Sequence, residues 1–400
     1  GCLSTTNKPK IDGLPTFSGD IYHTGHWPHE PVIFDKKRVA VIGTGSSGIQ
    51  AIPEIAKQAE KLFVLQRTPN YCVPARNRLL NPNFHLEFVK KIEFWRAKML
   101  ESRHGHPWVA PDREVRKTTK EKRLEIMERA WLHGGLSFRE SFSDVLVSAE
   151  SNKIMSEFIR QKILKTVMNP ETANTLLPKD HPFGTKRPPI DTNYFETFNR
   201  ENVCLFDLRA NPIKRCEENG IRFRDETLIK TDVIVFATGF DAMTGSIEKL
   251  ILRGKNGLKL SDKWNEGPET YLGLTVSGFP NLFTITGPGS PSVLTNMPRS
   301  IEQHVDWISN LINHMIHIGY AEVEADKSAA RKWTSHVRDV ANQTLLPRAN
   351  HSWYLGANIP GKPRVFMPYA NGLNNYRIYC DKIAKRKYQG FVFKGSARLS

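Results

Sequence analysis

Cysteine is scarce in this chain of 400 residues. Its five cysteines are scattered, odd in number and form no C-x-x-C pair; they are Cys2, Cys72, Cys204, Cys216 and Cys380. This usage excludes a disulfide scaffold, a cysteine-based zinc site and a dithiol oxidoreductase. The sequence therefore predicts no metal site, and it predicts a reducing compartment, by default the cytoplasm.

Long hydrophobic runs are also missing. Hydrophobic residues make up 39% of the chain, which is enough to bury two or three domain cores. No stretch approaches the roughly 20 apolar residues that a membrane span needs, and no signal peptide opens the chain. The first residues lack an initiator methionine, so the chain is expected to be the interior of a larger protein without a membrane partner.

Acidic residues are outnumbered by basic ones, 41 to 57, which gives a formal net charge of +16. The basic residues are dispersed, and the densest run, residues 113–123, is interleaved with glutamates. Such a run is typical of a solvated helix face, so nucleic-acid binding is not expected. Attraction for a small polyanionic ligand would account for part of the excess.

A glycine-rich turn is the clearest signal that is present. Arg38–Ile42 is a short apolar β run, and Gly43, Gly45 and Gly48 follow it at the G-x-G-x-x-G spacing before a helical pattern at 49–57. The alternative is a plain glycine turn, but the flanking strand and helix favour a dinucleotide site with its diphosphate on the helix N-terminus. The loop residues predicted to contact the cofactor are Gly43, Thr44, Gly45, Ser46, Ser47 and Gly48.

The second strand of this unit, residues 62–65, indicates which dinucleotide is bound. An NAD site usually places an acidic residue at the end of this strand to hold the ribose 2′-hydroxyl. Here Gln66, Arg67 and Thr68 follow instead. A guanidinium and a hydroxyl suit a charged 2′-phosphate, so the sequence predicts an NADPH site.

Amphipathic patterns replace β patterns in residues 67–185. Three sets of apolar residues recur at helical spacing and are interpreted as helix core; they are Phe88, Ile92, Trp95 and Met99, then Leu124, Met127 and Trp131, then Ile154, Phe158 and Ile163. Strands are expected again at 203–206, 232–236 and 282–286, and a long helix is expected at about 300–318.

Several motifs together resemble one enzyme family. The stretch Phe17-x-Gly19-x-x-x-His23-x-x-x-Trp27-Pro28 lies shortly before the glycine-rich turn. Further motifs are QRTPN at 66–70, GTKR at 184–187, ATGFD at 237–241, FPNLF at 279–283, GPGSPS at 287–292, SIEQHV at 300–305, and WYLGAN with GKPRVFMPY at 353–369. They resemble the type I Baeyer–Villiger monooxygenases, which are flavoproteins that depend on FAD and NADPH.

The resemblance implies an α/β fold with two Rossmann-like domains. Residues 1–66 and 186–239 would form the NADP-binding domain, 67–185 a helical insertion in it, and 240–400 the C-terminal part of the FAD-binding domain. Family members begin with another strand–G-x-G-x-x-G–helix unit that holds the ADP part of FAD. This chain has one such motif, so we expect a fragment with half of its FAD site and the missing N-terminal portion as a partner.

The resemblance also implies roles for residues around the GTKR motif. Arg187 would be catalytic, because a guanidinium keeps its charge and can stabilise an anionic C4a-peroxyflavin and the intermediate formed from it. The alternative is a surface arginine in a basic dipeptide. In the family this arginine pairs with an aspartate of the N-terminal part. Lys186 would bind the 2′-phosphate together with Arg67 and Thr68.

Other site residues follow from the resemblance alone. His23 would either be hydrogen-bonded structure or couple NADPH binding to domain motion. Trp353 would contact the nicotinamide cofactor or serve as a packing aromatic. Asn296 and Met297 would lie beside the isoalloxazine ring of FAD, and Val293 and Leu294 would line the substrate pocket.

The implied reaction converts a ketone, NADPH and O₂ into an ester or lactone, NADP⁺ and water. A flavin monooxygenase that oxygenates nitrogen or sulfur is the alternative within flavoproteins. A non-catalytic NADP-binding fragment is the alternative from a different class, because a half-absent FAD site leaves flavin binding in question.

Overall fold

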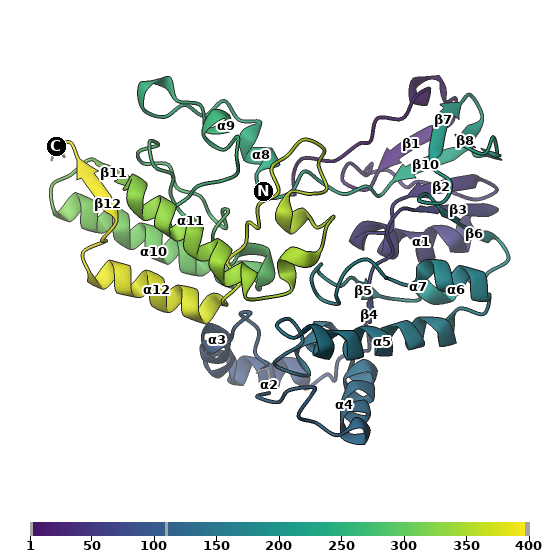
Figure 1. Cartoon of the computed structure of the whole chain (residues 1–400), viewed down its shortest axis with the longest axis horizontal. Helices are drawn as coiled ribbons and strands as arrows, with labels where there is room; N and C mark the ends of the chain where they lie inside the picture. The colour runs from purple at the N-terminus through teal and green to yellow at the C-terminus, as the bar shows by residue number, and fades with distance from the viewer. Residues whose placement is uncertain (1–2, 109–110, 397–400) are drawn as a thin grey trace. The chain divides into compact units, whose positions relative to one another are not determined.

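The computed structural model describes residues 3–108 and 111–396, which gather into two compact units (Figure 1). The first, here called the glycine-loop unit, comprises residues 4–77 and 111–240. The second, the C-terminal unit, is made mainly of residues 78–108 and 241–396. Each unit has its own hydrophobic core.

A parallel sheet of five strands is the centre of the glycine-loop unit. In spatial order the strands are β1 (Asp20–His23), β10 (Val233–Phe236), β2 (Arg38–Ile42), β3 (Lys61–Gln66) and β6 (Val203–Asp207). The three central strands are nearly continuous apolar runs, as expected for strands that are covered on both faces. The parallel sheet with crossing helices confirms the predicted α/β class.

Helix α1 (Ser46–Gln58) crosses from β2 to β3 and packs on one face of this sheet. Its buried residues Ile52, Ile55 and Ala56 recur at helical spacing. The predicted strand–turn–helix unit is therefore present, and the helix begins three residues earlier than the pattern at 49–57 indicated.

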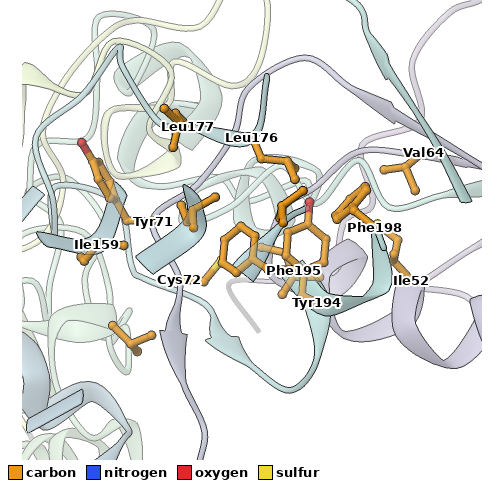
Figure 2. Packing of buried hydrophobic residues seen from close by; sticks show 14 of the residues in the cluster. Ile52, Val64, Tyr71, Cys72, Ile159, Leu176, Leu177, Tyr194, Phe195 and Phe198 are labelled. Atoms are coloured by element: carbon orange, nitrogen blue, oxygen red, sulfur yellow. The ribbon is translucent and has the colours of Figure 1, made fainter. Parts of the chain in front are cut away.

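A helical layer extends the same core. Its elements are β4 (Val73–Pro74), α4 (Lys120–His133), α5 (Ala149–Thr166), α6 (Pro170–Leu176), β5 (Ile190–Asp191) and α7 (Tyr194–Thr197). Figure 2 shows Ile52 of α1 and Val64 of β3 in one cluster with Ile159 of α5, Leu176 of α6 and Phe195 of α7. The helical segment and the sheet therefore share a single core.

The other face of the sheet is covered by an antiparallel sheet of β7 (Ile213–Glu217), β8 (Gly220–Phe223) and β9 (Leu228–Lys230). Phe206 of β6 stacks on Phe223 of β8 with ring centroids 5.1 Å apart. Both faces of the parallel sheet are thus buried, which leaves its strand ends as the place for a ligand.

The C-terminal unit is mainly helical. Its elements are α2 (Phe84–Lys90), α3 (Ile92–Glu101), α8 (Gly245–Glu248), α9 (Leu260–Lys263), α10 (Met297–His317), β11 (Glu322–Ala325), α11 (Lys327–Asn342), α12 (Leu373–Lys385) and β12 (Phe391–Lys394). Helices α10, α11 and α12 supply much of its main core. The Trp307 indole of α10 donates to the carbonyl of Cys380 in α12 at 3.0 Å, so the two helices are joined by a buried hydrogen bond as well as by apolar contact.

Three expectations from the sequence differ from the structure. Residues 282–286 form no strand, since within the described chain only Phe283 makes an isolated bridge, to Thr275. Asn281 and Thr286 have φ of 55°, a left-handed conformation that ends an extended run on both sides.

The second difference concerns an apolar set that falls on two short helices, α2 and α3, in which no described side chain is fully buried. The set is Phe88, Ile92, Trp95 and Met99. The helix-core interpretation is therefore wrong for this set, whereas it is confirmed for Met127, Phe158 and Ile163.

The third difference concerns residues 78–108, which lie with the C-terminal unit although the sequence pattern placed them in a single insertion at 67–185. Backbone hydrogen bonds explain this placement. The Leu373 amide donates to the Arg103 carbonyl at 2.8 Å, and the Asn296 amide donates to the His104 carbonyl at 2.8 Å. These hydrogen bonds join residues that are far apart in the sequence, so the periodicity of the sequence cannot reveal them.

No helix among the described residues is long and apolar enough to cross a lipid bilayer.

Candidate active site and cofactor sites

The glycine-rich turn joins β2 to α1, and its three glycines have different surroundings. A Cβ on Gly43, whose φ is 109°, would lie 2.5 Å from the Ala237 carbonyl oxygen. A Cβ on Gly48 would lie 2.2 Å from the carbonyl oxygen of Gly43 itself. A Cβ on Gly45 would meet no atom of the described chain within 4 Å. Two glycines are thus needed for packing, and the middle one borders open space that a ligand can enter.

Helix α1 offers its N-terminus at the same place. Gly45 is the N-cap, and among the described residues no side chain caps the first turn and no acidic side chain lies in it. The first backbone N–H groups of a helix have no partner within the helix, and they carry a partial positive charge. The turn therefore suits a diphosphate, and Thr44, Ser46 and Ser47 lie on it.

Gln66, Arg67 and Thr68, which follow one another at the end of β3, differ in their burial. Gln66 is only 1% exposed, and its amide donates to the Thr175 carbonyl at 2.9 Å. The hydroxyl of Thr44 donates to the Gln66 side-chain oxygen at 3.4 Å, so Gln66 fixes the loops around the site. Arg67 is exposed and Thr68 is half-buried. The group that can reach a ligand is therefore Arg67 with Thr68, while Gln66 faces inward.

A cluster of charged side chains lies beside Thr68. Arg209 donates through Nη2 to the Thr68 hydroxyl at 3.2 Å and to the Asp180 carboxylate at 2.6 Å. Asp180 also pairs with the buried His181 ring at 2.7 Å. Burial lowers the pKa of Lys186, the Asp180 carboxylate opposes this, and the nearby charges of Arg209 and Arg67 add to it. Lys186 thus lies near two further cations, Arg209 and Arg67, and one carboxylate, Asp180, which is a site for a further anion.

Arg209 was not identified from the sequence; its place just after an expected strand was a partial signal, and the neighbour of that strand is known only from the structure. It follows β6 by two residues, and β6 lies next to β3 with Gln66 aligned to Asp207. Because the carboxyl ends of parallel strands meet at one edge of the sheet, a basic residue just after β6 is expected near a basic residue just after β3.

The GTKR loop places the two other predicted residues next to each other. Lys186 is half-buried and takes part in the cluster just described, and Arg187 is exposed. The structure thus places Arg67, Thr68 and Lys186 around Arg209, and the candidate catalytic Arg187 follows Lys186 directly in the chain.

His23 lies at the end of β1 and is buried. Its Nδ1 accepts a hydrogen bond from the Gly25 amide at 2.9 Å, so the proton of the neutral ring is on Nε2, which lies 3.4 Å from the Thr238 hydroxyl. Burial lowers the pKa of His23, which keeps the ring neutral. The histidine thus joins the segment after β1 to the ATGFD turn after β10. These contacts agree with the first alternative, in which His23 is hydrogen-bonded structure.

The remaining predicted residues belong to the C-terminal unit. Val293 and Leu294 form a short 3₁₀ turn, and Asn296 and Met297 begin α10 directly after it. No described side chain caps α10 and no acidic residue lies in its first turn, so this helix N-terminus also suits electron-rich ligand atoms. Val293 is buried, whereas the others are half-buried.

Trp353 lies on a 3₁₀ turn, Trp353–Leu355, in the same unit. The chain that returns from this turn binds the GPGSPS loop, because the Gly289 amide donates to the Met367 carbonyl at 2.7 Å and the Tyr369 amide donates to the Ser290 carbonyl at 2.8 Å. The segment that carries Trp353 and the loop that leads to α10 are therefore fastened to each other. Arg187 lies in the glycine-loop unit.

Comparison with known proteins places this arrangement in a family. Residues 3–104 match the model of the FMO-like family, described as flavin-binding monooxygenase-like. The chain is 39% identical over 398 residues to cyclohexanone 1,2-monooxygenase of Acinetobacter sp., and the match covers 98% of this chain and 71% of that protein. It is 37% identical over 400 residues to phenazine N-monooxygenase PhzNO1 of Lysobacter antibioticus, with 98% and 72% covered.

A solved structure, OTEMO in complex with FAD and NADP, superposes with a TM-score of 0.94 at 36% identity and covers 98% of this chain and 74% of its own. These likenesses extend over nearly the whole chain, and the motifs described above agree with them. The chain belongs to the family of type I Baeyer–Villiger monooxygenases.

Proposed function

We propose that this chain carries the NADP site and part of the FAD site of an enzyme that oxidises a ketone to an ester or lactone with NADPH and O₂. The observation that carries the proposal is the GTKR loop. Its Lys186 lies in the cation cluster at the end of β3, and the adjacent Arg187 is a permanent cation next to that site.

The glycine-loop unit fits NADP(H) at two places. The open side of Gly45 and the N-terminus of α1 accept the diphosphate. Arg67, Thr68, Lys186 and Arg209 supply three positive charges and a hydroxyl for the 2′-phosphate. The solved relative that holds FAD and NADP supports this assignment.

Residues of the C-terminal unit fit part of an FAD site. Asn296 and Met297 begin a helix of 21 residues whose N-terminal dipole favours electron density on a bound ring. Val293 and Leu294 offer apolar surface next to them for the ketone, and Trp353 lies on the segment fastened to the same loop. The flavin, when bound, supplies the two-electron chemistry that activates O₂.

Arg187 would then act by charge alone. Attack of an oxygen nucleophile on a ketone places negative charge on the carbonyl oxygen, and a guanidinium beside it stabilises that charge without taking part in proton transfer. His23 would hold the ATGFD turn rather than touch the reacting atoms, since both of its ring nitrogens already have partners in this unit.

The positions of these sites indicate which domain each part of the chain forms. We propose residues 4–77 and 111–240 as the NADP-binding domain including its helical layer, and residues from 241 onward as part of the FAD-binding domain, with an N-terminal FAD-binding portion as partner. We also propose the cytoplasm as the compartment, since Cys72, Cys204, Cys216 and Cys380 are free thiols.

The test uses the purified chain, alone and with the family's N-terminal portion supplied, and a panel of ketones analysed by product chromatography. Arg187→Ala should abolish ester or lactone formation and leave binding of 2′,5′-ADP unchanged, because the residues proposed to bind the 2′-phosphate remain. Arg187→Lys should keep a small part of the activity, since it retains the charge but not the guanidinium geometry. Undiminished ester formation in Arg187→Ala would refute the role assigned to Arg187.

Oxygenation of a heteroatom is the second candidate, because phenazine N-monooxygenase of Lysobacter antibioticus is 37% identical over 98% of this chain. Presenting a cyclic ketone, a thioether and an aromatic N-heterocycle to the same preparation separates the two activities. We expect the ketone to be the best substrate, and turnover of the heterocycle alone would favour the second candidate.

A further inference from the structure

One buried asparagine outside the site just described holds the loop that carries Lys186 and Arg187. Asn152 lies in the first turn of α5 and is only 2% exposed. Its Nδ2 donates to the carbonyls of Val145, at 2.9 Å, and Phe183, at 2.8 Å. Its Oδ1 accepts from the Phe183 amide at 2.9 Å and from the Ser156 hydroxyl at 3.1 Å. All of the hydrogen-bonding capacity of the amide is used.

The orientation of this amide is fixed by its partners. Exchanging its oxygen and nitrogen would point an acceptor at two carbonyl oxygens and a donor at a backbone N–H. Asn152 therefore binds both the N–H and the C=O of Phe183, as a neighbouring β-strand would, but from the side of a helix. No other residue type offers a donor and an acceptor of this geometry except glutamine, whose side chain is one carbon longer.

The backbone that Asn152 binds is a tight turn. Thr185 donates through its amide, at 3.3 Å, and through its hydroxyl, at 2.7 Å, to the Pro182 carbonyl. Gly184 has φ of 79°, the left-handed conformation expected at the third position of a type II turn. Lys186 and Arg187 follow this turn directly, so its position determines where their Cα atoms lie.

We propose that Asn152 is a positioning residue for the GTKR loop, through which the helical layer sets the place of Lys186 in the 2′-phosphate site. This inference rests on the proposed function. Lys186 follows the bound residue Phe183 by only three positions, and a displacement of about 1 Å in a charged binding group can cost up to about 100-fold in function. The helical layer would then contribute to cofactor recognition without touching the cofactor.

The decisive variant is Asn152→Asp. It has the same shape, but it replaces the Nδ2 donor by a carboxylate oxygen that faces the carbonyls of Val145 and Phe183. The matched control is Asn199→Asp. Asn199 also binds backbone on both sides, accepting from the Met168 amide and donating to the Thr166 carbonyl, each at 2.8 Å. Its partners are at the far end of α5, about 20 Å along the helix from Asn152.

The measurement is calorimetric binding of 2′,5′-ADP and of 5′-AMP to the full chain, together with thermal unfolding. Asn152→Asp should weaken the affinity for 2′,5′-ADP by at least about tenfold and change the affinity for 5′-AMP by less than about twofold, because only 2′,5′-ADP carries the phosphate that Lys186 binds. Asn199→Asp should lower the melting temperature and leave the ratio of the two affinities unchanged. A change of melting temperature alone in Asn152→Asp would overturn the inference.

A milder variant keeps the test open if Asn152→Asp does not fold. Ser156→Ala removes the hydrogen bond to the Asn152 oxygen and the longer one, at 3.4 Å, that the Ser156 hydroxyl accepts from the Phe183 amide. It should reduce the preference for 2′,5′-ADP in the same direction but by less. An unchanged preference in a folded Ser156→Ala protein, with Asn152→Asp unfolded, would count against the inference. Failure of the proposed function is distinguishable, since the unaltered chain would then bind 2′,5′-ADP and 5′-AMP equally.

Discussion

At the scale of single residues, neighbours in the sequence have separate tasks. Gln66, Arg67 and Thr68 follow one another at the end of β3, yet the structure turns Gln66 into the core and leaves Arg67 exposed. The residue types after β3 were sufficient to predict the ligand. They were insufficient to predict Arg209, because its place depends on which strand lies beside β3.

Removing either guanidinium from this cluster should weaken binding of the phosphate. We expect Arg67→Ala to cost about 1.5–3 kcal/mol in the binding free energy of 2′,5′-ADP, since charge-assisted hydrogen bonds are lost. Arg209→Ala should cost less, because Asp180 already neutralises part of its charge. Calorimetry with 5′-AMP is the control, and equal losses for both ligands would contradict a 2′-phosphate site.

Two carboxylates of the glycine-loop unit should respond to pH with opposite signs. Burial raises the pKa of Asp191 to about 6, with Glu196 adding to the shift and the Tyr194 amide opposing it. The folded state therefore favours the protonated form, and its stability falls as pH rises from about 4 to 6. Asp191→Asn should stabilise the protein by about 3 kcal/mol at pH 8 and very little at pH 4.

Asp232 provides the comparison. The Arg38 guanidinium, bound to its carboxylate at 2.7 Å, holds the pKa of Asp232 at about 2. Asp232→Asn should therefore destabilise the protein at pH 8, with the loss disappearing as pH falls toward 2. Denaturant titrations at pH 4, 6 and 8 measure the effect of Asp191, and a further titration at about pH 2.5 measures the loss of the Asp232 contribution. Two variants that shift stability in the same direction at pH 8 would show that these assignments are wrong.

At the scale of elements, strands and helices with strong local signals were predicted and others were not. β2, β3 and α1 combine apolar runs, turn glycines and helical spacing in one short segment, and α10 buries Trp307, Leu311 and Met315 on one face. Residues 282–286 are equally apolar, but left-handed backbone at both ends prevents a strand. The apolar residues of α2 and α3 satisfy the same spacing without being buried, since periodicity states which face is apolar and not whether anything covers it.

The glycine-rich turn gives a test that separates folding from ligand approach. Gly48→Ala would place a methyl group 2.2 Å from the Gly43 carbonyl oxygen, so it should destabilise the fold by about 1–3 kcal/mol as well as impair binding. Gly45 has φ of −82° and open space at its Cβ. Gly45→Ala should therefore leave the melting temperature unchanged and still weaken the binding of NADP⁺, because the added methyl group takes up space that the diphosphate needs. Unaltered NADP⁺ affinity in a folded Gly45→Ala protein would move the cofactor away from this turn.

At the scale of the whole molecule, both units bury neutral histidines. His23 and His181 lie in the glycine-loop unit, and burial lowers the pKa of each. His304 lies in the C-terminal unit on α10, is fully buried, and accepts a hydrogen bond from the Thr286 amide at 2.9 Å. Burial lowers the pKa of His304 to about 4. A net charge of +16 adds repulsion when further protons bind.

These histidines predict a common response to acid. A histidine with a lowered pKa in the folded state stabilises the fold above pH 6.5, and this stabilisation is lost as pH falls toward the folded pKa, since the unfolded chain binds the proton more readily. For His304 the shift corresponds to about 3 kcal/mol, lost between about pH 6.5 and 4. His304→Gln keeps an acceptor for the Thr286 amide but cannot be protonated. The unfolding free energy of this variant should therefore depend less on pH in this range.

The control is His317→Gln, at an exposed histidine on the same helix, and the pH dependence of its unfolding free energy should match that of the unaltered chain. Urea unfolding followed at pH 7.5, 6 and 5 measures the slopes, and identical slopes for the two variants would show that the buried ring of His304 is not what makes the C-terminal unit sensitive to acid.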